Sequence, residues 1–211
     1  MKLIDIVVGI SLVSLVQLVP EPAVAGEDHA IHFSESDIMC SFAARPNFDL
    51  EVRLSKPSRE ARKSVEWLSD HVGIHPNFQV MAGKFEAGAS PVAFAAIHDK
   101  VRFIVYDVDF MYQSAKNTVT WQDLGVMAHE MGHHISGATT LGTKTPHDGE
   151  LEADRAAGHL LRLLGASVEQ ALSMASVFSS EGSLTHPPRD EREDAIIDGW
   201  ENAEALLQTS R

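Results

Sequence analysis

Three histidines and a glutamate lie within six consecutive positions, at His129, Glu130, His133 and His134. In a helix, at about 100° per residue, His129 and His133 share one face, about 40° apart and one turn along. Two imidazoles in that relation can bind one metal ion, and Glu130 is close enough to reach a water molecule on it. This is the pattern His-Glu-x-x-His, in which the histidines bind zinc and the glutamate acts as general base. His134, rotated by about 100° from His133, is expected to support the site or to pack.

The segment around these residues carries the signals of a helix. Thr120 and Asp123 form a capping box, which predicts a helix that begins at Trp121. Its apolar residues share a face that should pack on the core. They are Leu124, Met127, Ala128, Met131 and Ile135. Gly125 and Gly132 lie near the histidine side, where each costs about 1 kcal/mol relative to alanine, so we expect another backbone to approach closely there.

A catalytic zinc ion usually has three protein ligands and keeps one position for water. A second helix is predicted over residues 150–164, with Glu150 and Asp154 one turn apart on its apolar stripe. The other members of the stripe are Ala153, Ala157, Leu160, Leu161 and Leu164. Carboxylates on an apolar face are costly unless a cation meets them, which favours Glu150 as third ligand and Asp154 as the group that orients a ligand histidine. Ion pairs with arginine or lysine are the alternative, and His147 is a rival ligand.

The opposite face of this second helix carries charged residues and is expected to be solvated. Its members are Glu152, Arg155, His159 and Arg162. Their direction excludes Glu152 and His159 as ligands of the same ion.

The segment THPPRDER, residues 185–192, adds two candidate site residues, His186 and Arg192. His186, stiffened by two prolines, could reach the cleft and stabilise the oxyanion of a tetrahedral intermediate. Arg192 could pair with Asp154 or Glu150, or bind substrate. The alternative, which spacing alone leaves equally open, is that this segment is only the turn before a helix and that His186 and Arg192 lie on the surface.

The order of the motifs AHEMGHH, ELEAD and THPPRDER resembles the CAAX-prenyl-endopeptidase and heat-shock-membrane-protease family of gluzincin zinc metallopeptidases, over residues 101–200. The resemblance implies one zinc ion per chain, with the ligands His129, His133 and Glu150. It also implies that Glu130 is the general base and that Asp154 supports a ligand. His186 and Arg192 would lie at the active site. The implied fold is a zincin-like domain with a small sheet beside the active-site helix.

The predicted elements are typical of an α+β domain. Residues 78–110 have the composition of β-strands, with HDK as a hairpin turn between VAFAAI and VRFIVYDVDF. Further helices are predicted from Ser58 to Gly73, from Ser167, whose capping box uses Gln170, and over a last segment that ends near Leu207. Residues 57–211 are expected to form the metallopeptidase domain, and the packing of an N-terminal extension, residues 26–56, stays open.

The N-terminus has the layout of a secretory signal peptide. Lys2 precedes a largely apolar run over residues 6–19, and AVA, residues 23–25, offers a cleavage site. We expect residues 1–25 to be removed, leaving an exported, periplasmic or secreted chain without stable membrane insertion. Asp5 weakens the positive start, so an uncleaved anchor is the alternative.

The composition excludes some partners. The net charge is −13 and no lysine or arginine cluster stands out, which argues against a nucleic-acid partner. Cys40 is the only cysteine, so no disulfide can form within the chain. The oligomeric state stays open.

These features together predict a zinc endopeptidase that acts on protein or peptide substrates among exported or envelope proteins. The large relatives are integral membrane proteins, and this sequence lacks the long apolar runs of their transmembrane helices. Prenylated or membrane-embedded substrates are therefore not implied here. An exported, non-catalytic binding or assembly factor and a zinc hydrolase of non-peptide amides are the alternatives. An extended substrate is expected to add to a sheet edge around residues 93–97 and 101–106. Residues 26–56 or the loop 138–149 could also cover the cleft.

Overall fold

The computed structural model describes residues 29–34, 36–42, 50–72, 78–85, 92–111, 119–136 and 145–209. The predicted signal peptide, the helix stop at Gly73 and residues 138–144 of the loop lie outside these ranges. In the described part of the chain, no helix is long and apolar enough to cross a membrane.

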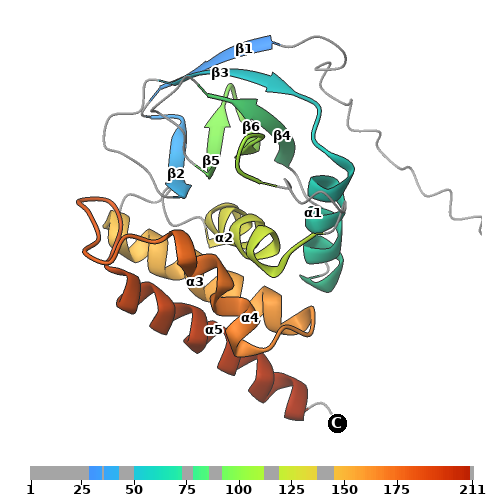
Figure 1. Cartoon of the computed structure of the whole chain (residues 1–211), viewed down its shortest axis with the longest axis vertical. Helices are drawn as coiled ribbons and strands as arrows, with labels where there is room; N and C mark the ends of the chain where they lie inside the picture. The colour runs from blue at the N-terminus through green and yellow to red at the C-terminus, as the bar shows by residue number, and fades with distance from the viewer. Residues whose placement is uncertain are drawn as a thin grey trace, which may run out of the picture.

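The described part of the chain folds into one curled sheet of six strands and five α-helices (Figure 1), which confirms the α+β class. The strand order is β1 (His29–Phe33), β3 (Leu50–Ser55), β4 (Phe78–Lys84), β6 (Val101–Asp107), β5 (Ala93–His98), β2 (Ile38–Phe42). Neighbouring strands are antiparallel, except that β4 and β6 run parallel.

The sheet includes the segment whose packing the sequence left open, because β1, β2 and β3 all come from residues 26–56. β2 pairs with β5, and β6 lies between β4 and β5. The prediction of a substrate-binding edge at residues 93–97 and 101–106 is therefore wrong. Among the described strands the edges are β1 and β2. The pairing of β2 uses main-chain hydrogen bonds, which leave little trace in the side-chain pattern.

The helices are α1 (Arg59–Val72), α2 (Trp121–Ser136), α3 (Pro146–Leu163), α4 (Val168–Ala171) and α5 (Arg189–Thr209). The start of α2 is confirmed, because the Thr120 hydroxyl accepts from the Asp123 amide at 3.1 Å and the Asp123 carboxylate accepts from the Thr120 amide at 3.1 Å. The caps at Ser58 and Ser167 are also present. The helix from Ser167, α4, ends at Ala171, and a 3₁₀ helix follows at Leu172–Val177.

The start of α3 was predicted four residues too late. Thr145 is its N-cap, and Asp148 completes a capping box, with Pro146 in the first turn. This arrangement satisfies the free amides of the first turn with side-chain oxygens. The sequence TPHD, residues 145–148, contains this capping box, so α3 begins at Pro146 and not at Glu150.

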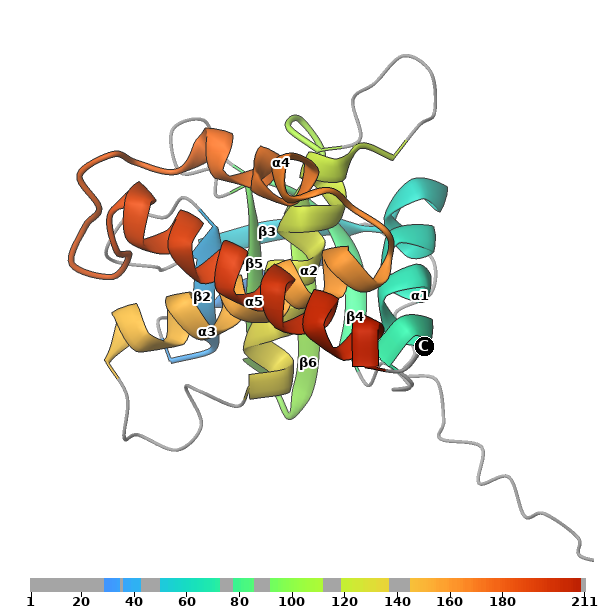
Figure 2. The same ribbon diagram turned by 90° about the horizontal axis from the view of Figure 1, so that it is seen from below.

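Helix α2 lies between the sheet and the pair α3 and α5 (Figure 1), and α5 lies across α3 in the view from below (Figure 2). The predicted core positions Leu124, Met127, Ala128 and Met131 are buried. Ile135 is 46% exposed, so that expectation is wrong. It lies in the last turn of α2, where the helix leaves the core. The histidine face of α2 is buried as well, because α3 covers it.

The hairpin turn between β5 and β6 was predicted and is confirmed. Asp99 and Lys100 have φ values of 48° and 67°, in the left-handed region that glycine favours. We expect Lys100→Gly to raise the free energy of unfolding by about 0.5–1 kcal/mol, because glycine avoids the Cβ strain of this region. Urea denaturation measures the change. Lys100→Ala removes the charge but keeps the Cβ atom, and an equal gain in that variant would contradict the backbone explanation.

Candidate metal centre

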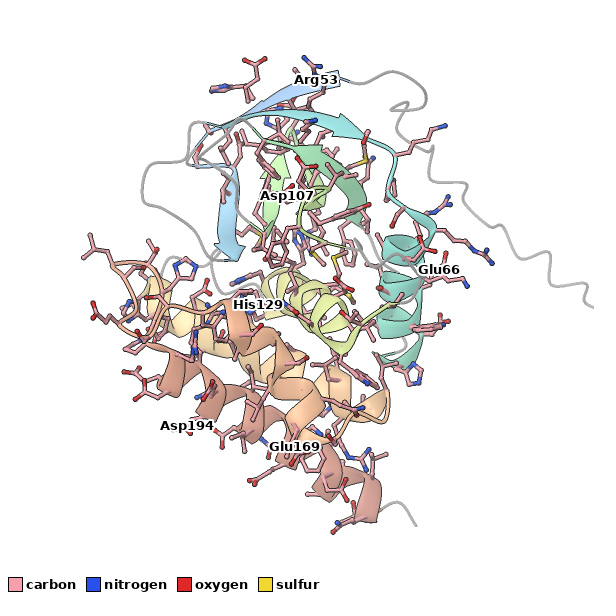
Figure 3. The ribbon with its side chains drawn as sticks, viewed as in Figure 1. Arg53, Glu66, Asp107, His129, Glu169 and Asp194 are labelled. Carbon is pink, nitrogen blue, oxygen red and sulfur yellow. The ribbon has the colours of Figure 1, made fainter. Side chains whose placement is uncertain are left out.

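The helices α2 and α3 bring two imidazoles and one carboxylate together in the interior. The Nε2 atoms of His129 and His133 lie 3.0 Å apart. Glu150 approaches them from α3, with 3.5 Å from its Oε2 to His129 Nε2 and 3.5 Å from its Oε1 to His133 Nε2. All three side chains are buried, with at most 1% exposed. Figure 3 labels His129, which lies where α2 meets α3.

The three donors suit a single ion. Their ligand atoms all lie within 4.8 Å of one another. In a tetrahedral site with bonds of about 2.0–2.1 Å, two ligand atoms are separated by roughly 3.3 Å, close to the distances found between these side chains. Imidazole nitrogen and carboxylate oxygen are also ligands that bind divalent transition metals. The buried His129, His133 and Glu150 group could therefore hold a metal ion.

Asp154 and Arg192 hold this group in place. The Asp154 carboxylate accepts from His129 Nδ1 at 2.8 Å, which leaves Nε2 of that ring directed toward the donor group. Arg192 donates to the same carboxylate through Nε at 2.7 Å and Nη2 at 2.9 Å. Its Nη2 also lies 3.2 Å from Glu150 Oε2. The ion-pair alternative from the sequence is thus realised by Arg192, on the same two carboxylates.

The pKa values follow from burial and from these neighbours. Burial lowers the pKa of His129, but the carboxylates of Asp154 and Glu150 outweigh it and raise the pKa to about 9. Burial and the positive charge of His129 lower the pKa of His133 to about 3. Burial alone would raise the pKa of Glu150, yet the two histidines and Arg192 bring it well below its usual range. Without a metal ion, the His129 ring is therefore protonated on both nitrogens, and so positively charged, near neutral pH.

His186 also reaches the donor group. Its Nε2 lies 3.6 Å from Glu150 Oε2, and its Nδ1 lies 2.8 Å from the Thr185 hydroxyl oxygen. The side chain is buried. His186 and Arg192 therefore both contact Glu150, which spacing alone left open.

The other histidines near the motif have different partners. His134 donates from Nε2 to the Phe103 carbonyl at 2.8 Å, and its ring stacks on Phe78. His147, the rival ligand, donates to the Ser183 carbonyl at 2.9 Å. Among the described residues the donor group includes neither of them, and it includes neither Glu152 nor His159.

The mid-helix glycines give a mixed result. A Cβ atom on Gly132 would lie 2.9 Å from the Ala153 backbone on α3, as predicted. A Cβ atom on Gly125 would meet only the Met174 side chain among its nearest atoms, so the backbone explanation is wrong there. Sequence reasoning missed Gly158 and Gly199, where α3 and α5 touch backbone to backbone. Their signal is a glycine inside each helix.

Phe178 was also missed, and its ring packs 3.8 Å from the guanidinium carbon of Arg192. It comes from the end of a 3₁₀ helix, so no spacing rule links it to the motifs. Comparison of the chain with protein-family models, with curated proteins and with solved structures finds no match. The function is therefore argued from the site itself.

Proposed function

We propose that this protein is a zinc-dependent endopeptidase with a zincin-like fold, of the family that its motifs resemble. The observation that carries the proposal is the buried group of two imidazoles and one carboxylate, with Glu130 next to His129 on the same helix. A structural zinc site usually has four protein ligands, whereas a catalytic site has three and keeps a position for water. Three donors, with the Glu130 side chain buried on the same helix as two of them, suit the catalytic arrangement.

The residues of the chain have separate roles in this proposal. A bound zinc ion would supply Lewis acidity, which polarises a carbonyl and lowers the pKa of water to about 7. Glu130 takes a proton from the attacking water and passes it to the leaving amine, so the amide yields a carboxylic acid and an amine. His186 stabilises the negative charge that develops on the carbonyl oxygen. Arg192 acts through Asp154 and Glu150, so its role is positioning.

The test compares the wild-type protein with Glu130→Gln, both loaded with one zinc ion per chain. We expect the wild type to cleave an unfolded protein and the variant to cleave it at least about 100-fold more slowly, because the glutamine cannot accept a proton. Mass spectrometry of the fragments measures the rates, and metal analysis checks that both retain zinc. Equal rates would contradict a role of Glu130 as base.

The complete burial of the donors favours one alternative, an exported binding or assembly factor that keeps its metal ion without turnover. Zinc bound to both proteins, with cleavage by neither, would support that alternative. Hydrolysis of non-peptide amides alone would support the second one, a zinc hydrolase of other amides.

We expect zinc binding between pH 7 and pH 8 to release about one proton. The pKa of His129 is raised to about 9, so zinc must displace a proton from its Nε2. The apparent affinity should rise about tenfold per pH unit up to pH 9, because proton and metal compete for the same atom. Calorimetry in buffers with different ionisation enthalpies counts the protons. Asp154→Asn should lower the pKa of His129, so that zinc binding to this variant releases fewer protons. An unchanged proton count would contradict His129 as the source of the released proton.

We also propose that residues 1–25 direct export and are removed, so that the mature chain begins at Gly26 in the periplasm or outside the cell. The support is the apolar run and the AVA site of the sequence. Fractionation of bacteria that express the full chain, with the N-terminus read by mass spectrometry, tests this. A chain found intact in the cytoplasm would contradict it.

A further inference from the structure

Beside the donor group lies a pocket of about 240 Å³, whose apolar walls include Val177, Phe178 and Pro187. We propose that this pocket receives an apolar side chain of the substrate, up to the size of phenylalanine, next to the bond that is cleaved. The inference rests on the proposed peptidase function and adds a substrate class to it.

The pocket is joined to the donor group by two shared side chains. His186 and Arg192 both line it, and both contact Glu150, at 3.6 Å and 3.2 Å from its Oε2. A side chain in the pocket therefore brings the main chain that carries it close to the donor group. Binding of this kind holds the scissile bond in place, and an enzyme lowers the reaction barrier by fixing the reacting groups in the right geometry.

The two basic residues give the pocket little charge. The Arg192 guanidinium is paired with Asp154 and Glu150, and its face packs on the Phe178 ring. The nitrogens of His186 face Thr185 and Glu150. Among the described residues that line the pocket, none is acidic. A lysine side chain would lose its hydration there and find no carboxylate, whereas an apolar side chain loses nothing.

The shape of the pocket is set before any ligand arrives. Gly182, with a φ of 70°, turns the chain at the rim, and the Ser183 amide donates to the His186 carbonyl at 2.7 Å. Arg189 donates from Nε to the Phe178 carbonyl at 3.1 Å. Preformed, largely apolar pockets with a few fixed polar groups are typical of ligand sites. A dry cavity of about 150 Å³ binds benzene, so this pocket has room for a phenyl ring.

Two adjacent serines provide a matched pair of variants. Ser179 and Ser180 are both exposed, but only Ser179 lines the pocket. Ser179→Trp should fill the pocket, whereas Ser180→Trp should leave it open. In the cleavage assay, we expect the wild type to prefer bonds next to phenylalanine or leucine over bonds next to lysine. Ser179→Trp should lose at least tenfold of that preference, and Ser180→Trp should keep it.

A binding measurement separates this inference from the peptidase function. The probes are the amides of Nα-acetyl-phenylalanine and Nα-acetyl-lysine, titrated into the zinc-free full-length protein and followed by NMR. We expect the phenylalanine amide to bind at least tenfold more tightly, with contacts to the Phe178 ring, and Ser179→Trp to weaken it at least tenfold. Equal binding of both amides, or binding unaffected by Ser179→Trp, would overturn the pocket.

The combined outcomes are distinguishable. Cleavage that depends on Glu130, without selective binding of the phenylalanine amide, would overturn the pocket and leave the peptidase. Selective binding with no cleavage of any substrate would support the pocket as an apolar side-chain site and overturn the peptidase.

Discussion

Arg192→Met should lower the free energy of unfolding of the metal-free protein by about 3–5 kcal/mol. Arg192 is 2% exposed, and its guanidinium contacts the buried carboxylates of Asp154 and Glu150. Methionine keeps much of the apolar volume against Phe178 but removes the charge. Two carboxylates would then stay in the interior with too little positive charge to balance them. Chemical denaturation in the presence of a chelator measures the loss.

The control is Arg155→Met, on the outer side of the same helix pair. Arg155 and Asp198 form an ion pair between α3 and α5 at 3.6 Å, with side chains 46% and 63% exposed. Exposed pairs contribute about 0–1 kcal/mol, so this variant should be almost as stable as the wild type. Similar losses in both variants would show that charge removal at this interface, rather than burial of the network, causes the effect.

Gly199→Ala should lower the free energy of unfolding by about 3 kcal/mol, although alanine is the better helix former. Helix propensity alone predicts a gain of about 1 kcal/mol. A Cβ atom at this position would lie 1.9 Å from the Arg155 carbonyl oxygen of α3, so the two helices must separate. Overpacking of this kind typically costs about 1–3 kcal/mol, and a rigid backbone contact belongs at the upper end.

The displacement should also reach the metal centre, because Arg192 lies on α5, two turns before Gly199. We expect the affinity for the proposed zinc ion to fall about tenfold, as for other changes in groups that support a ligand. Asn202→Ala, at an exposed position of α5, places an alanine without a contact and should be neutral or slightly stabilising. A Gly199→Ala protein as stable as Asn202→Ala would refute the close-contact argument.

Several features of the site could be predicted because they depend on neighbours within one helical turn. The start of α2 follows from Thr120 and Asp123, and the placement of His129 and His133 on one face follows from their spacing. Glu150 and Asp154 were expected to meet a cation because both lie on an apolar stripe, and both are buried against Arg192. Local geometry has few solutions, so spacing alone is enough to infer it.

Other features could not be predicted, because they depend on contacts between distant segments. The position of β2 beside β5 changed which strands lie at the sheet edge. The face of α3 that carries Arg162 was expected to be solvated, yet Arg162 is only 20% exposed, pairs with Glu204 and lies over the Trp200 ring of α5. The sequence left open whether Arg192 pairs with a carboxylate or binds substrate, and the packing of α5 on α3 brings it to Asp154 and Glu150.

The sequence by itself therefore determined which side chains can bind a metal ion and on which helical faces they lie, because helix periodicity and capping act over a few residues. Only the tertiary structure decided how deeply they are buried, which arginine balances them and what pocket adjoins them. Those properties arise where α2, α3 and α5 pack. The close approach of α3 and α5, in which Gly158 meets the Ile196 backbone and Gly199 meets the Arg155 backbone, joins segments that lie far apart in the sequence.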